Sequence, residues 1–327
     1  MKKNIALVTG GYSTEAQISY KSAETVLKNL DSSLFSVYYI DISKAGWFYV
    51  APSGEKWPVN KADFTVQTND AHLVFDAAFM CIHGTPGEDG KLQGYFEMIG
   101  LPYTSCDTAT AALTFNKRYT VATAAFAGVH VAKSLHLFKN LPYQLSAITA
   151  ALQLPVFVKP NNGGSSLGMS KVNHANVLEA AIAKAFAEDS QVLIEEFIAG
   201  REFTIGVYRN KGVVTTLPIT EVITKNEWFD FEAKYKGLSE EITPAVLTDE
   251  QAQKIRAAAS LVFETLNCKG VVRIDFIYNK ETDAPYMLEV NTVPGQSAAS
   301  IIPQQVKAAG GNLTDFYTQI LLEAFNA

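Results

Sequence analysis

Four side chains near the C-terminus have the chemistry of a site for a metal ion and phosphate. Asp275, Glu289 and Asn291 supply carboxylate and amide oxygens, which suit a hard cation such as Mg²⁺, and Arg273 adds a guanidinium. Two carboxylates that face each other across a pair of strands lie about 5 Å apart and repel. A cation between them would remove that repulsion, so these residues predict a magnesium site.

A β-hairpin is needed to bring these side chains together. Val271–Tyr278 and Tyr286–Val290 have the composition of strands, and the polar segment between them predicts a turn. If the hairpin is symmetric about Thr282, Asp275 lies opposite Glu289 and Arg273 opposite Asn291, all on one face, because strand side chains alternate. The opposite face is then apolar and pairs Ile274 with Val290, Phe276 with Leu288, and Tyr278 with Tyr286. A solvated hairpin with a surface Arg–Asp pair is the alternative, but the apolar opposite face favours the metal site.

A second group of residues has the chemistry of a phosphate-binding loop. The run Asn161–Gly168 contains three glycines and the hydroxyls of Ser165 and Ser166, so its backbone can approach a polyphosphate closely. Lys159 ends the apolar strand just before it. The run matches neither the P-loop nor the dinucleotide fingerprint. The segment Glu195-Glu196-Phe197-Ile198, after another strand, offers contacts for adenine and ribose.

The order of the predicted elements indicates an α/β (α+β) chain with three units. Residues 1–105 alternate strand, helix and strand, with glycines at strand ends, which predicts a doubly wound parallel sheet. Residues 106–195 and 196–327 mix helices and strands and form two further subdomains. The expected helices there include 109–127 and 249–266. Residues 221–247 lose periodicity and predict a long functional loop.

Composition limits the functions that remain open. The 327 residues include 27 basic and 33 acidic side chains, a net charge of −6, which argues against a nucleic-acid partner. No segment is long and apolar enough for a membrane span. The three cysteines lack the spacing of a zinc site or a disulfide framework. These features predict a cytoplasmic protein whose partners are small molecules.

The ordered set of motifs resembles the D-alanine–D-alanine ligases of the ATP-grasp superfamily. The resemblance extends over nearly the whole chain and rests on Gly10–Glu15, His83-Gly84, Gly87–Gly94, Asn116-Lys117, Val158–Pro160, Gly164–Val172, Gly200–Thr204, Glu232–Tyr235, Arg273–Asp275, Leu288–Thr292 and Ser300–Pro303. It implies an ATP-grasp fold whose two later subdomains sandwich ATP. It also implies an enzyme that phosphorylates one D-alanine and joins it to a second, to make D-alanyl-D-alanine for peptidoglycan precursors.

The resemblance further implies a role for each matching residue. It assigns ATP to Lys117, Lys159, Ser165, Ser166, Glu195, Glu196, Ile198, Glu202 and Lys234, and two Mg²⁺ ions, or Mn²⁺, to Asp275, Glu289 and Asn291. It implies that Arg273 stabilises the charge of the transition state, and that Glu15 and His83 bind the first D-alanine. Glu15, Ser165 and Tyr235 would form a hydrogen-bonded network that closes the site. Ser300 and Ile301 would bind the second D-alanine. Lys234 and Tyr235 would belong to a lid that excludes water. The similarity suggests a homodimer.

Several other functions are compatible with parts of the sequence. A D-alanine–D-lactate or D-alanine–D-serine ligase would share every ATP-site feature, although Tyr235 favours the dipeptide enzyme. Gln296–Ala299 lacks the aromatic residue frequent there in the family, and Ile301 replaces a frequent leucine, both near the second-substrate site. A nicotinamide oxidoreductase is suggested by the first strand and Gly10-Gly11, but it lacks the third glycine. A non-catalytic binding protein is disfavoured by the intact Arg273.

Overall fold

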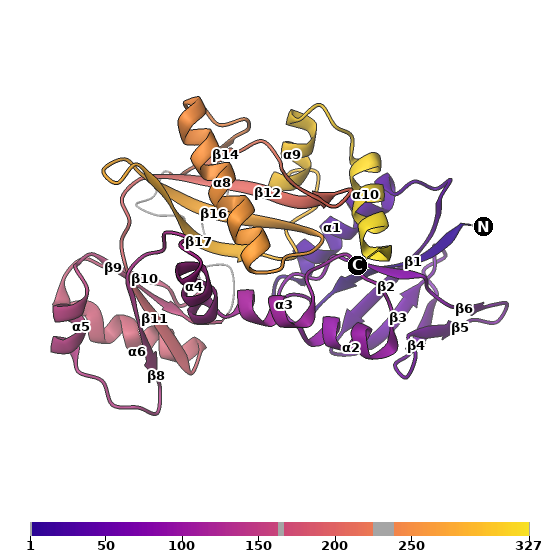
Figure 1. Cartoon of the computed structure of the whole chain (residues 1–327). Helices are drawn as coiled ribbons and strands as arrows, with labels where there is room; N and C mark the ends of the chain where they lie inside the picture. Colours follow the sequence, from indigo (N-terminus) through magenta and orange to yellow (C-terminus); the bar gives the residue numbers. More distant parts are fainter. Residues whose placement is uncertain (1, 163–166, 225–238, 327) are drawn as a thin grey trace.

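The computed structural model describes residues 2–162, 167–224 and 239–326, which form three sheets with helices packed around them (Figure 1). The predicted site residues Ser165, Ser166, Lys234 and Tyr235 lie outside these ranges. The first sheet has the strand order β6-β5-β4-β3-β2-β1-β7. Its elements are β1 (Lys3–Gly10), α1 (Ala16–Asn29), β2 (Phe35–Ser43), β3 (Gly46–Val50), β4 (Lys56–Asn60), β5 (Thr65–Gln67), β6 (His72–Leu73), β7 (Ala77–Met80) and α2 (Lys91–Ile99).

The first sheet is parallel only at one end, where β2, β1 and β7 lie side by side. Strand β1 pairs in parallel with β2 and β7, as expected, whereas β3 to β6 extend the sheet as an antiparallel meander that the sequence reading did not predict. Both faces of β1 are buried. Ile5 and Leu7 pack on the side of α1, while Ala6 and Val8 pack with Leu92 and Phe96 of α2. An apolar strand covered on both faces is typical of α/β units.

The second sheet is antiparallel and has the order β10-β9-β11-β8. The elements of this part are α3 (Thr108–Phe115), α4 (Lys117–Phe126), β8 (Ser134–Phe138), α5 (Leu145–Ala151), β9 (Val156–Pro160), β10 (Ser170–Val172), the 3₁₀ turn η1 (Ala175–Val177), α6 (Leu178–Glu188) and β11 (Gln191–Glu196). The single helix expected over 109–127 is broken at Asn116. The Asn116 side chain caps α4 by accepting from Tyr119 N, 3.2 Å away. Lys117 is therefore the first residue of a new helix.

The third sheet has the order β15-β14-β12-β16-β17, with β13 also paired to β12. Its elements are β12 (Arg201–Asn210), β13 (Val213–Thr216), β14 (Thr220–Thr224), β15 (Ser239–Ile242), α8 (Asp249–Thr265), β16 (Val271–Asn279), β17 (Ala284–Asn291), α9 (Ile301–Ala308) and α10 (Leu313–Phe325). A loop was expected over 221–247, but β14 extends to Thr224 and β15 also lies in this range. Strand β14 pairs with β12 and β15, and β15 forms the sheet edge.

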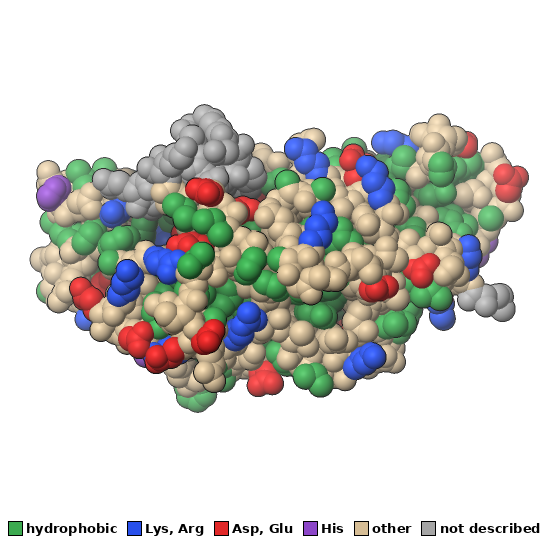
Figure 2. Space-filling view, turned by 90° about the horizontal axis from the view of Figure 1, so that it is seen from above, with side chains coloured by type: hydrophobic (Ala, Val, Ile, Leu, Met, Phe, Trp, Pro, Cys, Tyr) green, Lys and Arg blue, Asp and Glu red, His purple; other side chains and the backbone are tan. Residues whose placement is uncertain are grey.

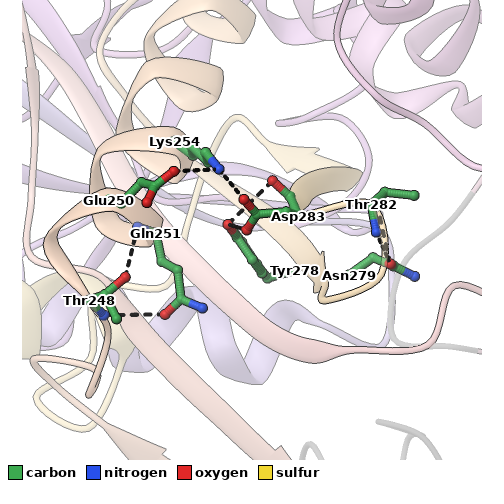
Figure 3. Close-up of polar contacts among 8 residues, drawn as sticks. All are labelled: Thr248, Glu250, Gln251, Lys254, Tyr278, Asn279, Thr282 and Asp283. Atoms are coloured by element: carbon green, nitrogen blue, oxygen red, sulfur yellow. Dashed lines mark hydrogen bonds and ion pairs between the residues drawn. The ribbon is translucent and has the colours of Figure 1, made fainter.

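The tip of the β16–β17 hairpin is fastened to helix α8 (Figure 3). Lys254 of α8 pairs with both Glu250 and Asp283, and the hydroxyl of Tyr278 donates to Asp283 Oδ1 at 2.5 Å. Inside the turn, Asn279 Oδ1 accepts from two backbone N–H groups at 2.9 Å. These contacts stabilise the conformation of the turn, and that conformation determines the register in which the two strands pair.

The beginning and the end of the chain pack together. Phe316, Tyr317 and Leu321 of α10 lie in one buried cluster with Ile5 and Leu7 of β1, and Figure 1 shows α10 beside the first sheet. In the face seen in Figure 2, Lys and Arg side chains are scattered and form no continuous basic patch. Among the described residues, no helix combines the length and apolarity needed to cross a bilayer.

Candidate active site

The β16–β17 hairpin places the predicted metal ligands as the sequence indicated. Asp275 is paired with Glu289 and Arg273 with Asn291. The pairing shifts by one residue beyond Asp275, so that Phe276 lies opposite Met287 rather than Leu288, and Tyr278 opposite Pro285 rather than Tyr286. These two predicted pairs were wrong because Leu288 forms a β-bulge, an extra residue on one strand that period-two alternation cannot reveal.

Three neighbouring side chains hold the Asp275 carboxylate. Arg273 donates from Nε to Oδ1 at 3.0 Å and from Nη2 to Oδ2 at 2.9 Å, in the forked geometry that guanidinium groups favour. Thr204 of β12 donates its hydroxyl to Oδ1 at 2.5 Å, and Asn291 Nδ2 lies 3.3 Å from Oδ2. Asp275 is only 7% exposed. The carboxylate is therefore fixed in direction before any ligand arrives.

Two cavities meet at this face of the hairpin. The first, here called the Arg273 cavity, has a volume of about 370 Å³, and the second, the Lys159 cavity, about 610 Å³. Both volumes are within the usual range for small-molecule sites. The residues that line both cavities include Glu15, Lys117, Glu202, Asp275 and Glu289. A ligand in one cavity can therefore meet a ligand in the other directly over the two carboxylates.

The Lys159 cavity collects the residues predicted to bind ATP. Lys159 and Glu195, from adjacent strands β9 and β11, form an ion pair whose side chains are only 13% and 8% exposed. Glu196 and Ile198 also line this cavity. The Glu196 carboxylate accepts from Gln153 N at 2.8 Å, which holds it at the rim.

The Arg273 cavity collects the residues predicted to bind the amino-acid substrates. Its lining includes Glu15, His83, Ser300 and Ile301; the predicted Tyr235 lies outside the described residues. Ser300 is the N-cap of α9, and its Oγ lies 2.8 Å from Ser297 Oγ. Backbone N–H groups at a helix start, together with hydroxyls, suit a carboxylate ligand.

Two glycines allow the loops around this cavity to close. A Cβ on Gly84 would lie 2.8 Å from Glu15 Oε2, and its φ is +68°, a conformation that other residues rarely adopt. A Cβ on Gly295 would lie 2.7 Å from Ser300 Oγ. Backbone is thus packed directly against the side chains of Glu15 and Ser300.

Burial shifts the ionisation of three groups in the Arg273 cavity. It lowers the pKa of His83 to about 4, helped by the positive charge of Arg273, so the ring is neutral. Burial raises the pKa of Glu88 to about 7, and the negative charge of Glu15 adds to the rise. Burial alone lowers the pKa of Arg273, but the charge and hydrogen bonds of Asp275 and the charge of Glu289 raise it above its usual value. The guanidinium is therefore always charged.

Some residues of the site were not among the predicted ones. Glu88 accepts from Gly84 N at 2.6 Å and faces Glu15, and Thr204 holds Asp275. Glu88 lies within the Gly87–Gly94 motif, so the sequence indicated this position, but no role was predicted for its side chain. Thr204 is two residues after Glu202 on β12, so strand alternation could have placed both on the face of the cavities.

The charges and donors of the site fit divalent cations. The Arg273 cavity is lined by six acidic residues and by three basic ones, Lys21, Lys117 and Arg273. Among residues 2–162, 167–224 and 239–326, no group of three His, Cys, Asp or Glu side chains is arranged to hold a metal ion. Two carboxylates and an amide would leave coordination positions for phosphate and water, as is usual for Mg²⁺.

Comparisons with known proteins agree with this geometry. Among solved structures, the D-Ala:D-Ser ligase VanG of Enterococcus faecalis superposes with a TM-score of 0.89 and 30% identity, covering 99% of this chain and 100% of that one. A D-alanine–D-alanine ligase of Bacillus anthracis complexed with ATP gives 0.79 and 25%, covering 99% and 98%. The fold and site define an ATP-dependent ligase of the ATP-grasp class.

The family follows from the sequence comparisons. The models described as D-ala D-ala ligase N-terminus and C-terminus match residues 4–106 and 116–322. The D-alanine–D-alanine ligase of Parabacteroides distasonis is 46% identical over 98% of this chain and 97% of its own length. The chain belongs to the D-ala D-ala ligase family.

Proposed function

We propose that this chain joins two D-alanine molecules into D-alanyl-D-alanine, with ATP and an acyl-phosphate intermediate, to supply peptidoglycan precursors in the cytoplasm. The observation that carries the proposal is the Arg273, Asp275, Glu289 and Asn291 face at the junction of the two cavities. A nucleotide in one cavity and a carboxylate substrate in the other would meet over that face. Phosphoryl transfer requires this kind of positioning.

The Lys159 cavity is the proposed ATP site. Its volume and its mixed apolar and charged lining suit a nucleotide, with Glu195, Glu196, Ile198 and Glu202 serving adenine and ribose. Lys117 and Lys159 would contact the phosphates. In the described structure Lys159 is paired with Glu195, so phosphate would compete with that carboxylate for the ammonium group. The roles assigned to Ser165, Ser166, Lys234 and Tyr235 rest on the family resemblance alone.

The donor D-alanine is proposed to lie between Glu15 and Arg273. The Glu15 carboxylate would hold its ammonium group, and neutral His83 would lie beside it without adding positive charge. The substrate carboxylate would then point toward the hairpin face. Arg273 would stabilise the charge that develops on the transferring phosphoryl group and later on the tetrahedral centre.

The metal ligands are proposed to be Asp275, Glu289 and Asn291, holding two Mg²⁺ ions that Mn²⁺ can replace. When bound, Mg²⁺ would neutralise phosphate charge. The two carboxylates lie on neighbouring strands, and the Asp275 carboxylate is already oriented by Thr204 and Arg273. Rigid outer partners of this kind typically strengthen metal binding.

The acceptor D-alanine is proposed to bind with its carboxylate at Ser300 and the backbone of Ile301, at the start of α9. The curated relative with 46% identity is named a D-alanine–D-alanine ligase, and this favours D-alanine over D-serine as the acceptor. The active form is proposed to be a homodimer. Each chain is proposed to consist of three units, 1–105, 106–195 and 196–327.

Phosphate release tests the proposed function directly. The purified protein is given ATP with D-alanine, L-alanine, D-serine or D-lactate, with and without Mg²⁺, and the products are separated chromatographically. We expect D-alanine and Mg²⁺ to be required and D-alanyl-D-alanine to be the main product. Equal turnover with D-lactate at neutral pH would contradict the acceptor assignment, and ATP binding without turnover would contradict catalysis.

A further inference from the structure

A buried serine on α1 touches two loops of the Arg273 cavity. Ser22 is 0% exposed, and its Oγ lies 3.1 Å from His83 Nε2. The same oxygen accepts the backbone N–H of Gln296 at 3.0 Å. His83 follows β7 in the first sheet, while Gln296 lies between β17 and α9. One hydroxyl group thus joins segments that are more than two hundred residues apart in the sequence.

The two contacts use the hydroxyl both as a donor and as an acceptor. A serine oxygen can accept from a backbone N–H and still donate its own proton. Neutral His83 offers Nε2 as an acceptor. This tautomer is assigned from the partners of the ring, which are Ser22 and the backbone of Val293. Ser22 therefore satisfies both Gln296 N and His83 Nε2 in the interior, where an unpaired polar group is costly.

Gln296 is the inward-facing anchor of the loop that carries the proposed acceptor site. Its neighbours Pro294, Gly295 and Ser297 line the Arg273 cavity, whereas Gln296 is 3% exposed and is not part of the lining. Its Oε1 accepts from the Tyr317 hydroxyl at 3.3 Å, and its Nε2 donates to Pro294 O at 3.2 Å. The loop is therefore tied at its buried residue to both α1 and α10.

The position of the anchor determines what it can control. Ser300 N donates to Ser297 O at 2.8 Å, and the two hydroxyls lie 2.8 Å apart, so Ser300 moves with the segment that follows Gln296. Glu15 and Gly84, on the donor side, contact each other directly and do not depend on Gln296. Loss of the anchor should affect the acceptor end of the cavity first.

We propose that Ser22 is a positioning residue that fixes the loop Val293–Ile301, and thereby Ser300, for binding of the acceptor amino acid. The proposal rests on the proposed function and deepens it, because it assigns acceptor binding to a residue that touches neither substrate. Ser22 would act through its hydrogen bond to Gln296 N, which belongs to this loop. The His83 ring keeps its hydrogen bond to the backbone of Val293 without Ser22, so the donor side should be affected less.

The test separates donor binding from acceptor binding in Ser22→Ala. Excess hydroxylamine takes the acyl group of the acyl phosphate and releases phosphate, so hydroxamate formation reports the donor KM, while dipeptide formation depends on both the donor and the acceptor constants. We expect the half-saturating D-alanine concentration for dipeptide formation to rise about tenfold, the effect of one lost hydrogen bond of ordinary strength. The donor KM from hydroxamate formation should change by less than about threefold.

A matched control removes a buried serine hydroxyl elsewhere. Ser105 is 2% exposed, accepts from Gln93 Nε2 at 3.2 Å and lines neither cavity. Ser105→Ala should therefore lower the melting temperature without raising the acceptor constant relative to the donor constant. If Ser22→Ala does not fold, Tyr317→Phe acts on Gln296 from α10 and should raise the acceptor constant in the same direction.

The possible outcomes are distinct. A selective rise in the acceptor constant supports the proposal. Equal changes in donor and acceptor constants, or no change in either, would overturn it. If the wild-type protein forms neither hydroxamate nor dipeptide, the proposed function fails instead, and that failure is visible before any variant is compared.

Discussion

Replacing Thr204 by valine should weaken the proposed metal site while leaving its proposed ligands in place. Thr204 is 1% exposed and donates its hydroxyl to Asp275 Oδ1 at 2.5 Å. Valine keeps the shape of threonine but lacks the donor. Asp275 would retain its two bonds from Arg273, and those bonds pull the carboxylate toward the guanidinium.

The size of the effect follows from the charge of the acceptor. A hydrogen bond to a charged group contributes about 1.5–3 kcal/mol, whereas a neutral one contributes about 1 kcal/mol. Thr110 offers the neutral comparison, because its hydroxyl donates to the carbonyl of Leu266 at 2.8 Å and the residue is 5% exposed. Loss of an outer partner of a metal ligand typically reduces metal affinity by about 10–100-fold.

Mg²⁺ titration of D-alanine-dependent phosphate release measures this effect. We expect the half-saturating Mg²⁺ concentration to rise at least about tenfold in Thr204→Val, to stay near the wild-type value in Thr204→Ser, and to stay unchanged in Thr110→Val. Urea unfolding should show a larger loss of stability for Thr204→Val than for Thr110→Val. An unchanged Mg²⁺ requirement in Thr204→Val would refute the reasoning.

Three further changes test other parts of the site. Gly84→Ala places a Cβ 2.8 Å from Glu15 Oε2 at φ +68°, so the donor KM should rise and the melting temperature should fall; normal values for both would contradict the close approach. Glu88→Gln should gain stability relative to wild type as pH rises from about 4.5 through 7. The pKa of Glu88 in the folded protein, near 7, exceeds the ordinary 4.5, so ionisation of Glu88 destabilises the fold. A difference in melting temperature between the two proteins that does not change with pH would contradict that shift. Lys159→Met leaves Glu195 buried without this partner and should lower the free energy of unfolding in urea by about 3 kcal/mol. Adding Glu195→Leu should restore most of that stability. If the two substitutions instead destabilise additively, the residues are not a coupled pair.

Local pattern predicted which residues share one face of the β16–β17 hairpin. Asp275, Glu289, Arg273 and Asn291 were placed on one face from strand alternation and turn symmetry, and the observed register confirms it. The parallel strands around β1 were also predicted, because their apolar runs are distinctive. Both inferences needed only neighbours in sequence or a single short turn.

The parts that could not be predicted depend on tertiary contacts. Strands β3 and β4 are only partly buried and lie between β2 and β5, so their place in the first sheet depends on pairing with those strands. The break at Asn116 depends on its side chain capping the next helix. The raised pKa of Glu88 depends on burial and on Glu15, which is distant in sequence. No local period encodes these effects.

The bulge at Leu288 has a consequence for engineering this protein. Leu288 and Glu289 are adjacent in sequence, yet both line the Lys159 cavity, so one strand provides an apolar wall and a carboxylate side by side. Deleting Leu288 would make the hairpin regular and keep Asp275 opposite Glu289, but it would remove that wall. The hairpin would then be regular, with the proposed metal ligands beside an enlarged Lys159 cavity. The irregular residue therefore marks a position where the shape of the cavity, and not the regularity of the sheet, determines the sequence.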